Sequence, residues 1–253
     1  MTAAMQRADL KEWSVEIYRA TAFLDPAKGA PEAGMWERLT GQPPDDIQQQ
    51  PRAGVLVEQG MLKAALMSVQ WQPGRVDLLL TYHPASGEAQ MGIGPYPTLD
   101  EDFKGMAEEL LGALSDRVTR IAFGLIMLLP AADRFESYAQ LEPYLSRSVK
   151  FNLDGSATDL SYQINRVRPS KTAEGAYLIN RVSKWNMAIY LRLHVNPANA
   201  ASVAQSSAFA TRMELDMSTD ASRQIPIAPE HLSPLFTELR EAAIEIAREG
   251  DVP

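Results

Sequence analysis

The sequence predicts an α+β fold, in which long helices pack on a curved, mainly antiparallel sheet. Residues 117–129 are apolar at almost every position, which is typical of a strand that is buried on both faces. Residues 98–116 and 233–250 carry apolar residues at helical spacing. Most other ordered segments alternate apolar and polar residues, as the strands of a half-buried sheet do.

The strands follow from this alternation and from the turn residues between the segments. Pro73 and Gly74 form a turn signal, because proline presets φ and glycine accepts positive φ, so a hairpin is expected there. The polar residues 41–51 are expected to form a loop. We expect strands at residues 13–23, 53–58, 61–71, 75–83, 117–129, 157–168, 176–182, 184–194 and 208–218.

Two long helices are predicted together with their ends. Thr98 and Glu101 have the spacing of a capping box, which predicts a helix over residues 98–116. Ser233 is expected to cap the last helix, with Pro234 in its first turn and Gly250 at its end. Shorter helices are expected at residues 31–41 and 131–145.

The order of these elements is similar in residues 13–116 and 117–250. Each half runs strand, helix, three or four strands and long helix, which predicts two β-α-β-β-β-α-like halves. The alternative is that antiparallel sheets with helices on one face often acquire this order by chance. No long linker separates the halves, so residues 1–253 are expected to form a single compact unit.

The composition is that of an ordinary globular protein and excludes some chemistry. With no cysteine, the chain has no disulfide, thiolate nucleophile or cysteine metal site. The longest apolar run, residues 121–132, is too short for a transmembrane helix, and no signal peptide is recognised at the N-terminus. We therefore expect a cytoplasmic protein without a membrane partner. The net charge of −8 disfavours non-specific nucleic-acid binding by the whole surface.

No catalytic motif is recognised in the sequence. The three histidines, His83, His194 and His231, are isolated from one another, and neither a nucleophile elbow nor a phosphate-binding loop is present. The acidic run from Asp100 to Asp102 is expected to offset the helix dipole of a first turn. The sequence therefore predicts a protein that is not an enzyme and that uses no metal or cofactor.

Two similar segments provide the candidate binding site. Ile164-Asn165-Arg166-Val167 recurs as Ile179-Asn180-Arg181-Val182, and residues 161–195 hold six basic residues against one acidic residue. If the segments form adjacent strands, each places an apolar residue and an arginine on one face and an asparagine on the other. Guanidinium groups bind carboxylate and phosphate through paired hydrogen bonds. The alternative is that these cations keep a solvent-facing sheet soluble. The predicted partner- or anion-binding residues are Arg166, Arg168, Arg181, Lys184 and Arg192.

Several segments resemble a sporadically distributed family of bacterial proteins of about this length, whose function is uncharacterised. They are residues 115–130 (SDRVTRIAFGLIMLLP), the Ile-Asn-Arg strand, residues 213–218 (MELDMS) and the amphipathic C-terminal helix. The order of elements matches from Thr98 onward. Family members tend to show Gly-Leu-Arg-Tyr where this chain has Ile121-Ala122-Phe123-Gly124. The resemblance implies no catalytic residues, and it implies an accessory role such as defence or toxin control.

The expected function is that of a non-enzymatic interaction protein, an adaptor, immunity or antitoxin-like module that binds a protein partner with an acidic or phosphate-bearing surface. One alternative is a small-molecule-binding protein with a cavity between the curved sheet and the C-terminal helix. Methionine side chains could line such a cavity, or could simply fill the core: Met61, Met67, Met187, Met213 and Met217. A second alternative is a protein that binds nucleic acid or another anion through the basic strand face.

Overall fold

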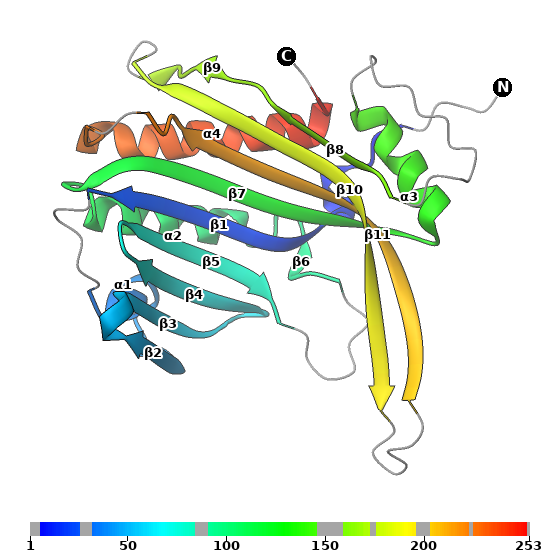
Figure 1. Cartoon of the computed structure of the whole chain (residues 1–253), viewed down its shortest axis with the longest axis horizontal. Helices are drawn as coiled ribbons and strands as arrows, with labels where there is room; N and C mark the ends of the chain where they lie inside the picture. The colour runs from blue at the N-terminus through cyan, green and yellow to red at the C-terminus, as the bar shows by residue number, and fades with distance from the viewer. Residues whose placement is uncertain are drawn as a thin grey trace.

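The structure, a computed structural model, describes residues 6–25, 32–83, 91–145, 159–172, 176–195, 203–222 and 225–251. Within these ranges, the side chains of residues 191–195 and 203–206 are not described. The described chain forms an α+β fold built on one large antiparallel sheet (Figure 1). The antiparallel sheet and the fold class agree with the prediction from the sequence.

The sheet runs in the order β2-β3-β4-β5-β1-β7-β11-β10-β8, and β6 and β9 are short additions that pair with β1 and β10. Every described strand pair is antiparallel. The strands are β1 (Ser14–Leu24), β2 (Asp46–Gln50), β3 (Val55–Leu62), β4 (Ala65–Gln72), β5 (Arg75–Tyr82), β6 (Gly94–Pro95), β7 (Val118–Ala131), β8 (Ser161–Asn165), β9 (Arg168–Pro169), β10 (Leu178–Val195) and β11 (Val203–Thr219).

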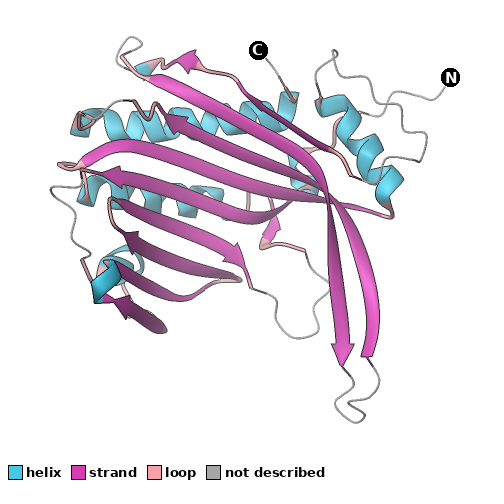
Figure 2. Cartoon of the chain, in the orientation of Figure 1, coloured by secondary structure: helices cyan, strands magenta, loops and turns pink. Residues whose placement is uncertain are grey.

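The helices pack on one face of the sheet, here called the helix face, and the opposite face is called the open face. The two longest helices, α2 and α4, lie side by side behind the sheet in Figure 2 and contact its central strands. The helices are α1 (Met35–Thr40), α2 (Asp100–Ala113), α3 (Arg134–Leu141) and α4 (Pro229–Glu249). Short 3₁₀ turns occur at Leu10–Glu12, Pro51–Ala53 and Glu142–Tyr144.

A chain of aromatic rings joins the sheet to both long helices. Tyr18 of β1 stacks on Phe103 of α2, with ring centroids 5.1 Å apart. Phe103 contacts Phe123 of β7 at 6.3 Å, and Phe123 meets Phe236 of α4 edge-to-face at 5.9 Å. All four rings are buried, so this contact line forms the centre of the core.

The central position predicted for residues 117–129 is confirmed. β7 lies between β1 and β11, and Phe123 pairs with Ala20 on one side and Met217 on the other. The two strands predicted at residues 176–182 and 184–194 are instead one strand, β10, which is 18 residues long. Ser183 between them does not break the strand, because its small side chain is buried on the helix face like Arg181 and Trp185.

The loop predicted at residues 41–51 is partly wrong, because Asp46–Gln50 forms the edge strand β2. Its polar side chains are all exposed, so it lacks the apolar alternation that marks a half-buried strand. The single strand predicted at residues 61–71 is also wrong. The chain turns at Lys63, where φ is 56°, so Leu62 ends β3 and Ala65 begins β4.

The predicted N-terminal caps of both long helices are wrong, because their polar side chains have partners elsewhere, whereas Gly250 ends the last helix as predicted. Glu101 accepts a hydrogen bond from Arg240 at 2.6 Å instead of closing a capping box with Thr98. Ser233 donates to Glu108 at 2.8 Å. The last helix begins five residues earlier than predicted, at Pro229, and contains Pro234 within it.

Candidate functional site

The two Ile-Asn-Arg segments lie on neighbouring strands, as the repeat predicts. Asn165 of β8 pairs with Val182 of β10 in an antiparallel register. Ile179 and Arg181 are buried on the helix face. Asn180 points to the opposite side, where its Oδ1 accepts a hydrogen bond from Asn165 Nδ2 at 3.1 Å. The arginine side of the motif therefore faces the helices and not solvent.

Arg166 is held in a bidentate ion pair. Its Nε and Nη2 donate to Asp251 Oδ1 and Oδ2 at 2.5 and 3.0 Å, and Tyr162 Oη donates to Asp251 Oδ2 at 2.7 Å. The Asp251 side chain is only 1% exposed. The hydrogen bonds from Arg166 hold the pKa of the Asp251 carboxyl below its usual range. This pair fastens the turn after β8 to the residues that follow α4.

Arg168 and Arg181 approach one carboxylate on α4. Arg168 Nη1 donates to Glu245 Oε2 at 3.1 Å, whereas Arg181 Nη2 lies 3.9 Å from the same oxygen, beyond hydrogen-bonding distance. Arg181 is 2% exposed. Burial, and next the charge of Arg168, lower the pKa of Arg181 below its ordinary value.

The five predicted basic residues therefore do not form one exposed patch, and this part of the prediction needs correction. Arg166, Arg168 and Arg181 share the helix face, whereas Lys184 lies on the open face and pairs with Glu214 at 3.2 Å. Lys184 is three positions after Arg181 along β10, and an odd offset places the side chain on the opposite face of the strand. The side chain of Arg192 lies outside the described residues, although its backbone belongs to β10.

A charged cluster on the open face was not recognised in the sequence. Glu16 of β1 accepts hydrogen bonds from Tyr190 Oη at 3.0 Å and from Arg212 Nε at 2.9 Å. Arg212 also contacts Glu214, the partner of Lys184. Burial and the charge of Glu16 raise the pKa of Tyr190. These residues are far apart in sequence, so only the strand order β1-β7-β11-β10 brings them together.

A second ion pair on the open face depends on a glycine. Arg19 of β1 reaches across β7 to Asp216 of β11, with Nη2 and Oδ2 2.9 Å apart. Gly124 lies between them in the register. A Cβ at this glycine would lie 3.1 Å from Arg19 Nε, so the absent side chain makes room for the guanidinium.

A groove of about 630 Å³ runs along α4, close to the start of α2. In its lining, Asp100 accepts hydrogen bonds from Tyr96 Oη at 2.8 Å and from Arg240 Nε at 3.1 Å. Burial and the charge of Asp100 raise the pKa of Tyr96. The groove is lined by Tyr96, Pro97, Asp100, Glu101, Arg240, Glu241, Ile244, Glu245, Arg248 and Glu249.

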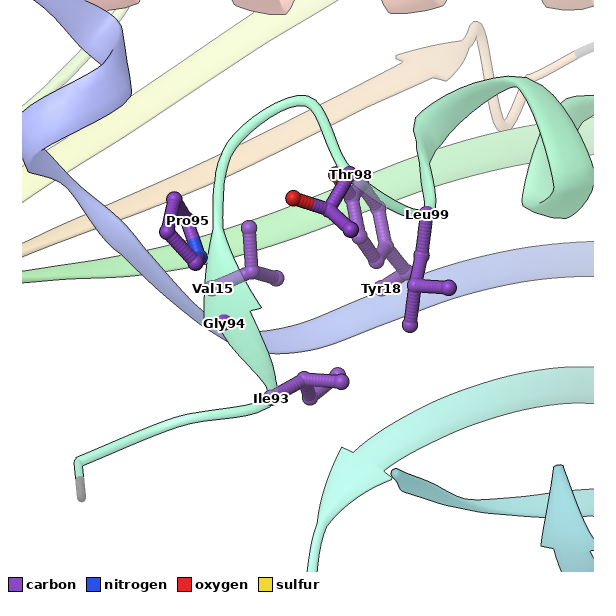
Figure 3. A pocket seen from close by; sticks show the side chains of 7 residues that line it. All are labelled: Val15, Tyr18, Ile93, Gly94, Pro95, Thr98 and Leu99. Carbon is purple, nitrogen blue, oxygen red and sulfur yellow. The ribbon is translucent and has the colours of Figure 1, made fainter. Parts of the chain in front are cut away.

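A second, much smaller cavity lies between β1 and the segment before α2. Figure 3 shows Val15 and Tyr18 of β1 close to Ile93 and Leu99 of that segment. Its volume of about 10 Å³ is the space of about one water molecule. The buried Tyr18 hydroxyl has no hydrogen-bond partner among the described residues. This cavity can therefore hydrate one hydroxyl, and it is too small for an organic ligand.

The longest strands extend beyond the sheet. β7 accompanies β11 only as far as Phe209, and β8 accompanies β10 only as far as Asn186. Six further residue pairs, from Tyr190 with Ala208 to Val195 with Val203, join β10 and β11 alone. We call residues 187–195 and 203–208 the ribbon. In Figure 1 it bends away from the sheet and projects past the rest of the described chain.

The comparisons give no relative. No protein-family model, no curated protein and no solved structure matches this chain.

Among the residues that the structure describes, no cluster of histidine, aspartate and glutamate is arranged to bind a metal ion. No helix in the same ranges has the length and apolar character needed to cross a bilayer. The fold and site thus define a single-sheet α+β protein with helices on one face and a projecting ribbon.

Proposed function

We propose that this chain is a non-enzymatic interaction protein that binds a protein partner through the ribbon. The observation that supports the proposal is that six consecutive residue pairs of β10 and β11 have no further strand beside them among the described residues. At about 3.3 Å per residue these pairs span about 20 Å. A two-stranded ribbon is marginally stable in water and gains stability from a third strand or a packed apolar face.

The ribbon offers both kinds of contact. Its two outer edges have no strand partner among the described residues, and such edges are templates for pairing with another chain. Ile189 at its base is 48% exposed, and Phe135 of the neighbouring helix α3 is 54% exposed. In the sequence, Leu191, Leu193 and Val195 continue the apolar alternation that Ile189 begins. A partner that contributes a strand and apolar side chains would cover these groups.

The base of the ribbon is fixed to the sheet, which favours a docking role over a free hinge. Tyr190 and Arg212 both bond to Glu16 on the open face. On the helix face, Thr211 bonds to Ser137 of α3, with the two hydroxyl oxygens 3.0 Å apart. A ribbon held in a fixed direction loses less conformational entropy when it binds.

The partner is a protein, as expected from the sequence, but it binds the ribbon instead of the basic strands, and the module acts as an adaptor, immunity or antitoxin-like protein in a bacterial cytoplasm. Affinity purification from the native host tests it with two matched variants. Ile189→Asp places a charge on the base of the ribbon, and Ile47→Asp places one on the exposed edge strand β2. The proposal expects a protein retained by the parent and by the β2 variant but lost with Ile189→Asp. Equal recovery with both variants would contradict it.

We further propose that residues 13–116 and 117–250 are duplicated halves. From the centre outward, the sheet order reads β1, β5, β4, β3, β2 on one side and β7, β11, β10, β8 on the other. In each half the first strand is central and the last long strand is its neighbour, and a long helix follows. If a superposition of the two halves does not overlay strands at matching positions, the duplication is wrong.

A further inference from the structure

The Nε–Nη2 edge of the Arg181 guanidinium group has no hydrogen-bond partner among the described residues, whereas the same edge is paired in two other arginines. Arg166 and Arg240 each use the edge formed by Nε and Nη2 to bind both oxygens of a carboxylate, on Asp251 and Asp100 respectively. Arg181 Nε and Nη2 are buried and have no hydrogen-bond partner among the described residues. This edge has the geometry that pairs with carboxylate or phosphate.

The surroundings of Arg181 contain an excess of positive charge. Three arginines, Arg166, Arg168 and Arg181, face two carboxylates, Asp251 and Glu245. Asp251 is fully engaged by Arg166 and Tyr162, so among the described residues Glu245 remains for the other two guanidinium groups. Arg168 Nε is also buried without a partner in the described chain. Unpaired buried charges are costly, and a bound counter-charge removes that cost.

The two guanidinium groups are close enough to share one oxyanion. Arg168 Nη1 and Arg181 Nη2 lie 3.1 and 3.9 Å from the same oxygen of Glu245, so these two nitrogens are no more than about 7 Å apart. The side chain of Glu245 is 42% exposed and lines the groove along α4. Neither arginine lines the groove itself, so a ligand in the groove reaches them only when the side chain of Glu245 moves aside.

We propose that Arg181 and Arg168 form a binding site for a single oxyanion, a carboxylate or phosphate group that enters from the groove along α4 and displaces Glu245. The oxyanion accepts from Nε and Nη2 of Arg181 and from the guanidinium of Arg168. Arg166 stays with Asp251 and adds a favourable charge. This site is independent of the ribbon, since it lies on the helix face at the end of α4.

The test measures thermal unfolding of the purified full chain in inorganic phosphate, in acetate and in chloride at one ionic strength. Phosphate or acetate is expected to raise the Tm along a saturating curve, and chloride is not. Whichever oxyanion gives the larger shift identifies the preferred group. Arg181→Lys keeps the charge but loses the two-nitrogen edge, so at least three quarters of the shift should disappear. Arg19→Lys, at a paired arginine on the open face, should retain it.

Glu245→Gln provides a second variant that is expected to fold, because its side chain is half exposed. It removes the competing carboxylate, so the Kd for the oxyanion should fall at least threefold. The proposal is overturned if phosphate and acetate act no more strongly than chloride on the parent protein, or if Glu245→Gln weakens the oxyanion effect. Because this assay contains no protein partner, its result leaves the proposal for the ribbon unaffected.

Discussion

Replacing Arg166 with methionine should lower the free energy of unfolding by more than the loss of an exposed surface ion pair would. The variant removes both donors that Arg166 directs at Asp251, while the Asp251 side chain stays 1% exposed. Tyr162 Oη remains as a donor at 2.7 Å. A buried carboxylate would then keep one neutral partner in place of a charged, bidentate one.

The magnitude follows from the burial of the two partners. Breaking a fully buried ion pair costs about 3–5 kcal/mol. The Arg166 side chain is 31% exposed, so solvent screening reduces this to about 2–3 kcal/mol. For a chain of this size, about 1 kcal/mol changes the Tm by about 2–4 °C, so we expect a decrease of about 5–10 °C. Arg38→Gln is the control, because its ion pair with Glu109 is about half exposed on both sides and should contribute under about 0.5 kcal/mol.

Urea unfolding at several pH values checks this reasoning. Arg166 lowers the pKa of Asp251 in the folded protein, so the pair stabilises the fold above the ordinary aspartate pKa of 3.8. That contribution is lost as the pH falls through the lower, folded pKa. The difference between the parent and Arg166→Met should therefore shrink on acidification. Adding Asp251→Asn to Arg166→Met should restore at least half of the loss at pH 7. A loss no larger than that of Arg38→Gln, or a difference independent of pH, would refute the account.

Three further substitutions test other contacts. Glu238→Gln should lower stability by about 2 kcal/mol in urea unfolding, because this buried carboxylate on α4 accepts four hydrogen bonds from the chain after β9 and a glutamine cannot accept them all. An unchanged midpoint would contradict that role. Gly124→Val should cost about 1 kcal/mol by displacing Arg19, and the cost should be smaller in an Arg19→Ala background, which removes the guanidinium and keeps only the Cβ 3.3 Å away. Equal costs in both backgrounds would show that Arg19 is not the cause. Tyr190→Phe should cost about 1 kcal/mol by removing the hydrogen bond to Glu16, and an unchanged Tm would argue that this bond does not fix the base of the ribbon.

The parts of the fold that were predictable are those where local pattern and burial agree. β7 is apolar on both faces and lies in the centre of the sheet, between β1 and β11. The face assignment of the Ile-Asn-Arg segments also follows from alternation alone, because a strand cannot place Arg181 and Asn180 on the same side. The edge strand β2 was not predictable in this way. Its five exposed residues gain their order from pairing with β3 and not from burial.

The environment of the candidate site depended on contacts that the sequence does not encode locally. Arg166 and Asp251 are 85 residues apart, and Glu16 and Arg212 are 196 residues apart. The composition showed an excess of basic residues in residues 161–195, and an excess of acidic residues elsewhere, without showing which acids meet which bases. The helix face received three of the arginines because α4 presents Glu245 and is followed by Asp251. The prediction of an exposed basic face was therefore wrong, because these arginines lie against carboxylates that are distant in the sequence.

The central claim is that the ribbon contacts a protein partner, and site-specific photo-crosslinking in the native host tests it most directly. A photoreactive amino acid is placed at Ile189 at the base of the ribbon, or at Ile47 on the edge strand β2, which is also exposed. The account predicts one discrete crosslinked species of higher mass from position 189 and none from position 47. If position 189 gives no crosslink, or if both positions give the same products, the ribbon is not the binding surface.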